Sequence, residues 1–459
     1  MHQPKLGLLG LYLELYDRAM PQVRPRIEAF YQTIAGELER RGMAVVSAPV
    51  CRVRAEFAQA LESFQAAGVE GLVSLHLAYS PSLESAPVLA ASGLPLLVLD
   101  TTPTAGYGPG QDPDELMYNH GIHGVQDLCN MLLRLGQPFA LEAGHWQESG
   151  VLDRAAAWGR AAGLAAAMRR ARVGLIGEPF AGMGDFAVPF PLLKESIGLE
   201  VVPASREGLQ ALLPAPDDPE VDREMAADLG ACAGPVPEEA HRESVRAGLA
   251  VRRWLAQEGL GAFSLNFLQI GDSGLPTVPF LEASKAMARG IGYAGEGDVL
   301  TAALVGVLAQ AWPTTFTEMF CPDWQGNRVF LSHMGEVNLA LLEGRPQLVQ
   351  RPFPWAPVAP PVHAVGRLQP GQAVLVNLAP MPDEAYRLLL APVRVVAPEG
   401  EDRMAGLVHG WLEPRVAVAD FLAGYSRVGG THHCGLAYGA GLPELAHFGS
   451  IMGWDTVTL

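Results

Sequence analysis

The chain has 459 residues, which is more than one hydrophobic core usually supports, so two or three domains are expected. Hydrophobic residues make up 49% of the sequence, and this content excludes an intrinsically disordered chain. The net charge of −17 argues against a surface for nucleic acid or anionic membranes. Neutral or cationic ligands, such as sugars and metal ions, fit this charge better.

The five cysteines lie far apart and form no CxxC pair, so we expect a reducing environment and no disulfide framework. We also expect no export signal, because no basic and apolar leader precedes the first strand-like run. The longest apolar helix candidate, residues 299–312, is too short to span a bilayer. These features predict a soluble, cytoplasmic protein.

The first two thirds of the chain alternate short apolar runs with amphipathic segments. Apolar runs lie at residues 6–13, 44–50, 71–77, 95–100, 173–177, 199–203 and 261–270. Segments with helical spacing lie between or after them, at 24–41, 54–68, 153–172, 238–260, 277–290 and 302–312. This alternation predicts doubly wound parallel sheets. We therefore expect a Rossmann-like α/β domain over residues 1–150 and a second one over residues 151–313.

From residue 314 onward the pattern changes to β-branched stretches, broken by proline and glycine. These stretches cover residues 314–320, 328–332, 372–378 and 393–397, and a proline-rich connector lies at 352–361. They predict an antiparallel, β-barrel-like C-terminal domain over residues 314–459. The glycine clusters at 106–110, 182–184 and 295–297 lack the spacing of a dinucleotide or phosphate loop and predict turns instead.

Side chains able to bind a metal gather in the last third: Glu296, Glu318, His333, His432 and His433. Carboxylates combined with imidazoles suit Mn²⁺, Co²⁺ or Mg²⁺, and such a site can leave positions open for two oxygens of a polyol. A carboxylate beside the ion can also move protons.

Each of these residues also has a structural explanation. Glu296 could stabilise the start of a helix, Glu318 could lie on an exposed strand face, and His333 could be a hydrogen-bonded core residue. Neighbouring residues of a strand point to opposite faces, so at most one of the paired histidines should bind the metal unless a bulge intervenes. Residue chemistry alone does not decide which one.

Four segments in this region occur in a characteristic order. They are Gly295-Glu-Gly-Asp298, the Thr-x-Phe-x-Glu stretch that ends at Glu318, Ser332-His-Met334, and Gly430-Thr-His-His433. Together they resemble the C-terminal half of the L-arabinose isomerase and L-fucose isomerase superfamily. The resemblance implies that Glu296, Glu318, His333 and His433 hold a metal, commonly Mn²⁺. It also implies that the two glutamates transfer protons and that His432 lies beside the substrate.

A weaker resemblance covers segments nearer the N-terminus, where ordinary loop or core packing is the alternative. It implies further substrate-binding residues: His123, His120, His76, Tyr79, Met183, Phe267 and Tyr12. In the family, the residue that corresponds to His123 reaches a neighbouring subunit, which implies a homotrimer or homohexamer. The sequence departs from the arabinose isomerase pattern after His333 and around Tyr12, so we expect a divergent, fucose-isomerase-like subgroup whose sugar is not assigned.

The sequence thus predicts a metal-dependent aldose–ketose isomerase for a free pentose or deoxyhexose of the L-arabinose or L-fucose type. The reaction would pass through a cis-enediolate. One alternative is a metal- and sugar-binding sensor without turnover, and another is an epimerase or hydrolase acting on a related polyol. The pair of carboxylates favours catalysis, because a sensor does not need two acid/base groups beside the ion.

Overall fold

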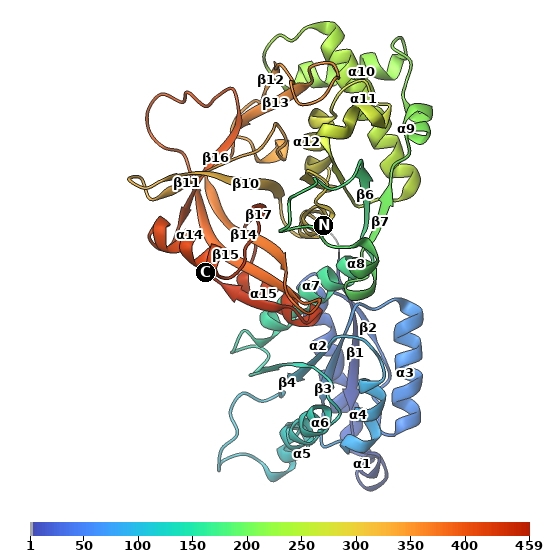
Figure 1. Cartoon of the computed structure of the whole chain (residues 1–459). Helices are drawn as coiled ribbons and strands as arrows, with labels where there is room; N and C mark the ends of the chain where they lie inside the picture. The colour runs from blue at the N-terminus through green and yellow to red at the C-terminus, as the bar shows by residue number, and fades with distance from the viewer. Residues whose placement is uncertain (1–2) are drawn as a thin grey trace. The chain divides into compact units, whose positions relative to one another are not determined.

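The computed structural model describes residues 3–459 and divides into two compact units (Figure 1). The N-terminal unit ends at Ala166 and is drawn in blue to teal. The C-terminal unit spans Ala167–Leu459 and runs from green to red. Each unit is described by itself.

The N-terminal unit is built on a five-stranded parallel sheet in the order β2-β1-β3-β4-β5. This order is that of flavodoxin-like folds, in which ligands bind at the carboxyl edge of the strands. The strands are β1 (Lys5–Leu11), β2 (Ala44–Ser47), β3 (Gly71–His76), β4 (Leu96–Asp100) and β5 (Ala140–Ala143).

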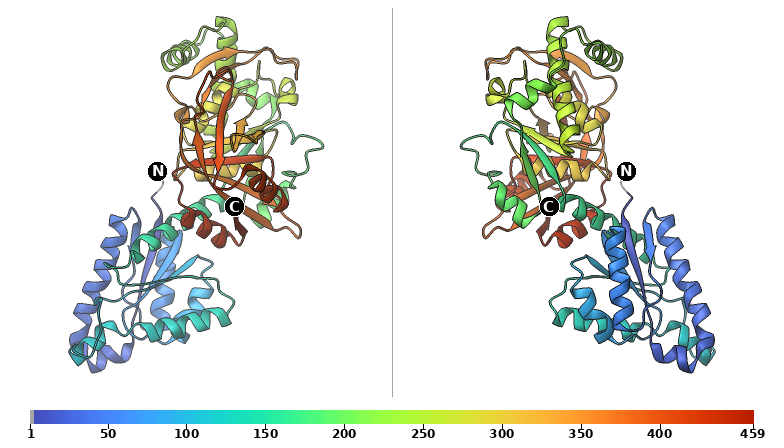
Figure 2. Two further views of the ribbon diagram at one scale, coloured as in Figure 1. Left: turned by 90° about the vertical axis from the view of Figure 1, so that its left-hand side faces the viewer. Right: turned by 90° about the vertical axis from the view of Figure 1, so that its right-hand side faces the viewer.

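Helices cover both faces of this sheet (Figure 2). Strand β1 is buried on both sides, as its nearly continuous apolar sequence predicts for a strand inside a parallel sheet. One face packs against α3 (Arg54–Ala67), α4 (Ser82–Ala90) and α6 (Ile122–Arg134), and the other against α2 (Arg24–Arg40) and α7 (Val151–Arg169). Two short helices, α1 (Glu14–Ala19) and α5 (Leu116–Asn119), lie in the connections.

The C-terminal unit begins with a four-stranded parallel sheet in the order β7-β6-β8-β9. Its strands are β6 (Arg172–Ile176), β7 (Glu200–Pro203), β8 (Ala262–Leu265) and β9 (Gly292–Gly295). Its helices are α8 (Phe190–Ser196), α9 (Arg206–Leu212), α10 (Pro219–Ala231), α11 (Glu238–Glu258) and α12 (Phe280–Ala288). Strand β8 is shorter than predicted, because the Asn266 side chain accepts a hydrogen bond from the Leu268 N–H and starts a 3-10 helix, Phe267–Ser273.

The remaining strands form a nine-stranded sheet in the order β12-β13-β16-β11-β10-β17-β14-β15-β18. Strands β15 and β16 also pair, which closes six of the strands into an antiparallel barrel. The barrel strands are β10 (Thr314–Asp323), β11 (Arg328–Ser332), β14 (Gly371–Pro380), β15 (Tyr386–Val396), β16 (Val408–Pro414) and β17 (His433–Tyr438). Strands β12 (Gln347–Gln350), β13 (Val362–Arg367) and β18 (Asp455–Thr458) and helices α14 (Val418–Arg427) and α15 (Leu442–Met452) complete the unit.

The predicted fold class is confirmed: two parallel α/β sheets are followed by an antiparallel barrel. Helix α13 (Val299–Leu308) packs against both β9 of the parallel sheet and β10 of the barrel. All ten of its residues are buried, which explains why its sequence is apolar on every side. Within residues 3–459, no helix has the length and apolar character required to cross a membrane.

Helix α13 crosses strand β9 with backbone against backbone. A Cβ atom at Gly292 would lie only 2.7 Å from the Cα of Gly306 and would also meet the carbonyl oxygen of Ala302. Gly292 and Gly306 therefore allow the helix to pack directly on the strand that carries Glu296 at its end.

We expect Gly292→Ala to lower the free energy of unfolding by about 1–3 kcal/mol, because the added methyl group overpacks this crossing. Urea denaturation followed by circular dichroism measures the effect. Gly261→Ala is the control, since a Cβ at Gly261 meets no described atom within 4 Å. Equal stability of the two variants would contradict the role given to the crossing.

Candidate active site

The candidate site lies where the carboxyl edge of the parallel sheet meets three barrel strands. Glu296 directly follows β9, and Glu318 lies on β10. In the barrel, Glu318 pairs with His433 of β17 on one side and with Ser332 of β11 on the other. Directly opposed residues of antiparallel strands have close side chains, so this register brings Glu318 next to His433 and to His333, which follows Ser332.

The backbone at Glu296 has a positive φ of 64°, a conformation that residues other than glycine seldom adopt. Both flanking glycines are required by close contacts. A Cβ at Gly295 would lie 2.6 Å from the His333 ring, and one at Gly297 would lie 2.5 Å from the Pro179 backbone. The Gly-Glu-Gly sequence therefore holds Glu296 in a strained position, as is common at functional sites.

Two groups of side chains are close enough to hold a metal ion. One consists of Glu296, His432 and His433, and the other of Glu318, His333 and His433; within each group the ligand atoms lie within 4.8 Å of one another. His433 belongs to both. The Nδ1 atom of His433 faces a carboxylate, so only Nε2 is left for an ion, and the two groups describe one site.

Two of the histidines are oriented by buried carboxylates. His433 Nδ1 lies 3.0 Å from an Asp298 oxygen, and His333 Nδ1 lies 2.9 Å from a Glu336 oxygen. Glu336 also accepts a hydrogen bond from the Tyr293 hydroxyl at 2.6 Å. An ionised carboxylate only accepts hydrogen bonds, so each Nδ1 carries a proton, and Nε2 is the ring atom left to bind an ion in exchange for its own proton. Histidine ligands of metals are usually backed in this way.

The ligand atoms themselves fit a cation. The Oε2 atom of Glu296 and the Nε2 atom of His433 are buried, lie 3.5 Å apart and have no hydrogen-bond partner among the described residues. Burial raises the pKa of Glu296, but the neighbouring histidines outweigh burial and lower the pKa to about 2. For His433, burial lowers the pKa, and the carboxylates of Asp298 and Glu296 outweigh it and raise the pKa to about 9. Both shifts reflect a negatively charged pocket that favours positive charge.

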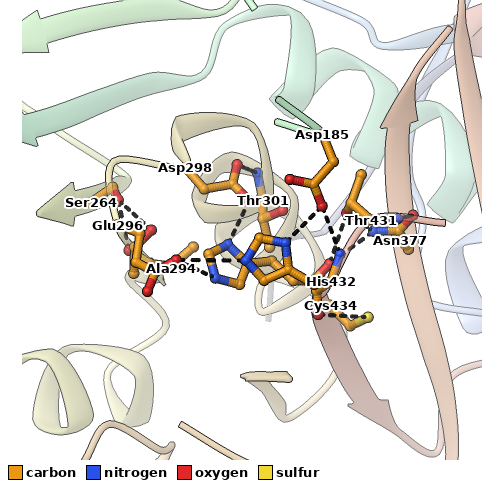
Figure 3. A network of polar contacts seen from close by, with 12 residues as sticks. Asp185, Ser264, Ala294, Glu296, Asp298, Thr301, Asn377, Thr431, His432 and Cys434 are labelled. Atoms are coloured by element: carbon orange, nitrogen blue, oxygen red, sulfur yellow. Dashed lines mark hydrogen bonds and ion pairs between the residues drawn. The ribbon is translucent and has the colours of Figure 1, made fainter. Parts of the chain in front are cut away.

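His432 takes a different place from the one that strand alternation predicts. Strand β17 begins at His433, so His432 precedes the strand and the alternation rule does not apply to this pair. The two rings lie 4.2 Å apart, and His432 Nε2 is 3.6 Å from Glu296 Oε2. Asp185 contacts His432 Nδ1 at 2.6 Å (Figure 3).

The turn before these histidines is fixed by the barrel. The Asn377 side chain donates to Thr431 Oγ1 and to the carbonyl of His433 and accepts from the Thr431 N–H (Figure 3). The Tyr425 hydroxyl donates to the Thr431 carbonyl at 2.7 Å, and its ring occupies the space where a Cβ at Gly430 would lie. The Gly-Gly-Thr-His-His sequence is thus explained by the turn that presents both rings.

Two other predicted substrate-binding residues also lie in the C-terminal unit. Phe267 is buried at the end of β8 and packs edge-on against Phe180, with ring centroids 4.9 Å apart. Met183 is half-buried in the loop between β6 and α8. Their contact with a substrate stays a prediction.

The remaining predicted substrate-binding residues lie in the N-terminal unit. Tyr12 follows β1 and His76 ends β3, so both are at the carboxyl edge of that sheet. The His123 ring lies 5.0 Å from the Tyr79 ring and 5.3 Å from the His120 ring. These residues form one cluster, and they do not belong to the unit that carries the metal-capable side chains.

Sequence reasoning did not select the three carboxylates behind the histidines. Asp298 and Glu336 lie within motifs singled out above, and Asp298 also caps helix α13 by accepting a hydrogen bond from the Thr301 N–H at 2.9 Å. Its position at the start of a predicted helix could have drawn attention to Asp298. Asp185 lies in an irregular loop whose sequence gives no such signal.

Comparison with known proteins agrees with this geometry. Residues 230–311 match the L-arabinose isomerase central domain, and residues 313–455 match the L-arabinose isomerase C-terminal domain. Two adjacent segments, within residues 230–455, thus match domains of the L-arabinose isomerase family. The metal-capable groups described above all lie within or between these two matched segments.

Curated relatives extend the likeness over most of the chain. L-arabinose isomerase from Anoxybacillus flavithermus is 26% identical over 95% of this chain and 90% of its own length. Those from Herpetosiphon aurantiacus and from a Nocardioides species are 27% and 28% identical, covering 95% and 84% of this chain and 90% and 80% of their own lengths. The predicted enzyme class, an intramolecular oxidoreductase of the aldose–ketose isomerase kind, is confirmed by these relatives.

Glu336→Gln should weaken the binding of Mn²⁺ about 10- to 100-fold, the usual effect of removing the carboxylate behind a ligand histidine. The amide can still accept from Tyr293 but offers N–H to His333 Nδ1, which moves the ring proton to the atom that would bind the ion. Calorimetric titration of metal-free protein measures the affinity. Glu343→Gln, at the exposed ion pair with Arg367, is the control. Unchanged affinity in Glu336→Gln would contradict the assignment.

Proposed function

We propose that this protein is a divalent-metal-dependent isomerase that converts a free aldose of the L-arabinose or L-fucose type into its ketose. One observation carries the proposal: Glu296, which follows a strand of the parallel sheet, and Glu318, on a barrel strand, each lie within 4.8 Å of a ring nitrogen of His433 in a group able to hold a metal ion. Two carboxylates at one cation site provide both an acid/base pair and ligands. The L-arabinose isomerase relatives support the same reaction.

Four residues would hold the ion, namely Glu296, Glu318, His333 and His433. The unpartnered Glu296 Oε2 and His433 Nε2 support this assignment, as does the carboxylate behind each of the two histidines. When bound, the ion supplies positive charge that draws in two neighbouring sugar oxygens and stabilises the negative charge that develops on them. Mn²⁺ is our first choice, with Co²⁺ and Mg²⁺ as alternatives, because oxygen and imidazole ligands suit all three.

The two glutamates would move the protons. One carboxylate takes the proton from C2 of the open-chain aldose and returns it to C1, which passes the reaction through a cis-enediolate. The other carboxylate transfers the hydroxyl proton from O2 to O1, so that the carbonyl group moves from C1 to C2 and no atom is gained or lost. The geometry does not distinguish which of Glu296 and Glu318 takes the carbon-bound proton.

The charge of the site supports a neutral substrate. The ionisable groups gathered there are the carboxylates of Asp185, Glu296, Asp298, Glu318 and Glu336 and the histidines His333, His432 and His433. The acids outnumber the histidines, and among the described residues no lysine or arginine forms an ion pair with any of these groups. A phosphorylated sugar or a sugar acid would be repelled, whereas a free aldose and a divalent cation would not.

The N-terminal unit would contribute to substrate binding through the cluster around His123. The cluster includes buried polar atoms without partners among the described residues, namely the Tyr12 hydroxyl, both ring nitrogens of His76 and Nδ1 of His120. Burial lowers the pKa of His76 to about 3, so its ring stays neutral and suits hydrogen bonds to uncharged hydroxyl groups. We further propose that the protein is a homo-oligomer in which His123 contributes to the substrate site of a neighbouring copy. Its proposed location is the cytoplasm.

Glu318→Gln should abolish ketose formation, a loss of at least about 10²-fold, because an amide cannot transfer the proton. Ketose appearance is followed by ¹H NMR, and circular dichroism shows whether the fold is kept. Glu413→Gln, at a surface ion pair with Arg394 on the barrel, is the matched control. Turnover near that of the wild type in Glu318→Gln would remove this residue from the mechanism.

An assay with a panel of free aldoses decides between the proposed isomerisation and the alternative functions. Metal-free protein is incubated with L-arabinose, L-fucose and further free aldoses, with Mn²⁺, Co²⁺ and Mg²⁺ in turn, and products are identified by NMR in D₂O. We expect a ketose, formed only when a metal is added, with deuterium at C1 in those molecules for which the protonated carboxylate exchanges with D₂O before it delivers its proton. Sugar binding without any product would indicate a sensor, and an epimeric aldose would indicate an epimerase.

A further inference from the structure

One loop of the parallel sheet contacts three parts of the site. Residues 177–189 connect β6 to α8 and have no regular secondary structure. The Phe180 N–H donates to the carbonyl of Glu296 at 3.0 Å, and the Phe186 ring stacks on His433 at 5.2 Å with an interplanar angle of 10°. Asp185 lies between these two contacts and bonds to His432.

The base of this loop is anchored to the neighbouring strand β8. The Asn266 side chain donates to the carbonyl of Glu178 at 2.7 Å, and the Glu178 N–H donates to the Gln269 side chain at 2.7 Å. The loop is therefore held at its start by the parallel sheet. Its far part reaches the barrel residue His432 through Asp185.

Asp185 binds His432 through a single oxygen atom. Its Oδ2 accepts one hydrogen bond from the His432 backbone N–H at 3.0 Å and another from the ring Nδ1 at 2.6 Å (Figure 3). Because both donors belong to the same residue, the two bonds fix the ring relative to its own backbone. The carboxylate accepts only, so Nδ1 carries a proton, and Nε2 faces Glu296 Oε2 at 3.6 Å.

The two neighbouring histidines differ in exposure, and so do their carboxylates. The side chains of His433 and Asp298 are both 0% exposed, whereas those of His432 and Asp185 are 32% and 38% exposed. His433 therefore faces the buried ion position. His432 occupies the open side of the site, where a substrate arrives.

We propose that Asp185 is a positioning residue, which holds the His432 ring so that its Nε2 forms a hydrogen bond with a sugar hydroxyl beside Glu296. This inference rests on the proposed isomerase function. It assigns different tasks to two aspartates: Asp298 orients a histidine toward the ion, and Asp185 orients a histidine toward the sugar. Loss of Asp185 should therefore affect turnover and leave metal binding intact.

Asp185→Ala tests this separation, because it removes the oxygen that accepts from both donors of His432. We expect kcat/KM for L-arabinose with Mn²⁺ to fall about 10- to 100-fold, while the calorimetric affinity for Mn²⁺ stays that of the wild type. Asp185→Glu keeps a carboxylate and should restore most of the lost activity. Asp217→Ala, on an exposed loop, is the matched control. An unchanged kcat/KM, or a parallel loss of Mn²⁺ affinity, would overturn the proposal.

A double-mutant cycle separates positioning of the ring from general support of the loop. In a His432→Ala background the ring is absent but the backbone N–H remains, so Asp185→Ala should cause no further loss. The same 10- to 100-fold loss in that background would show that Asp185 acts through the loop, and the proposal would fail.

Failure of the proposed function is distinguishable from failure of this inference. If wild-type protein forms no ketose from any aldose, the isomerase assignment falls, and Asp185 is tested by structure instead. Crystal structures of the wild type and of Asp185→Ala should then show the His432 ring turned away from Glu296 in the variant. A ring in the same position in both structures would overturn the inference.

Discussion

The carboxylate behind each imidazole sets the geometry of the site. Buried carboxylates are costly in free energy unless they are paired, so Asp298 and Glu336 each require a donor such as His433 Nδ1 or His333 Nδ1. Pairing at Nδ1 turns Nε2 of each ring toward the interior of the site. The negative charge that remains after pairing is concentrated where Glu296 and Glu318 lie, which favours the divalent cation proposed for this site.

The parallel sheet and the barrel each provide groups that orient site residues of the other layer. His433 belongs to the barrel, but its carboxylate comes from Asp298, at the start of the helix that follows β9. Conversely, Glu336 follows the barrel strand β11, and its hydroxyl donor is Tyr293 of β9. Helix α13 packs against both layers and keeps the two sets of residues in register. Neither layer alone contains all of the proposed ligands together with the carboxylates that orient them.

The sequence predicts the parts of this arrangement that are determined locally. Glu318 and His333 are identifiable because each sits in a short motif, and the alternation of apolar runs identifies most strands of both parallel sheets. Strand β9 is not identifiable in this way, because its Gly-Tyr-Ala-Gly sequence has little strand propensity and is a strand only through pairing with β8. In strand β9, tertiary pairing therefore outweighs the low strand propensity of the sequence.

Three features of the site depend on contacts between distant segments. The positive φ of Glu296 is understood only once Gly297 is seen against Pro179. The shared direction of the paired histidines depends on where β17 starts, which is set by the pairing of His433 with Glu318. Asp185 is 247 residues away from His432 along the chain, and no periodicity connects the two.

The two parallel sheets share a strand order through their first four strands, and both carry functional candidates at the carboxyl edge. The chemistry at the two edges differs. In the C-terminal unit the edge is acidic and suits a cation, whereas in the N-terminal unit it presents Tyr12, His76 and His120 with buried, unpartnered polar atoms. Each such atom costs about 1–3 kcal/mol when it stays unpaired, so a fold that retains several of them at one edge favours a ligand that supplies hydrogen bonds. A neutral polyol has the hydroxyl groups to do so, and a metal ion does not.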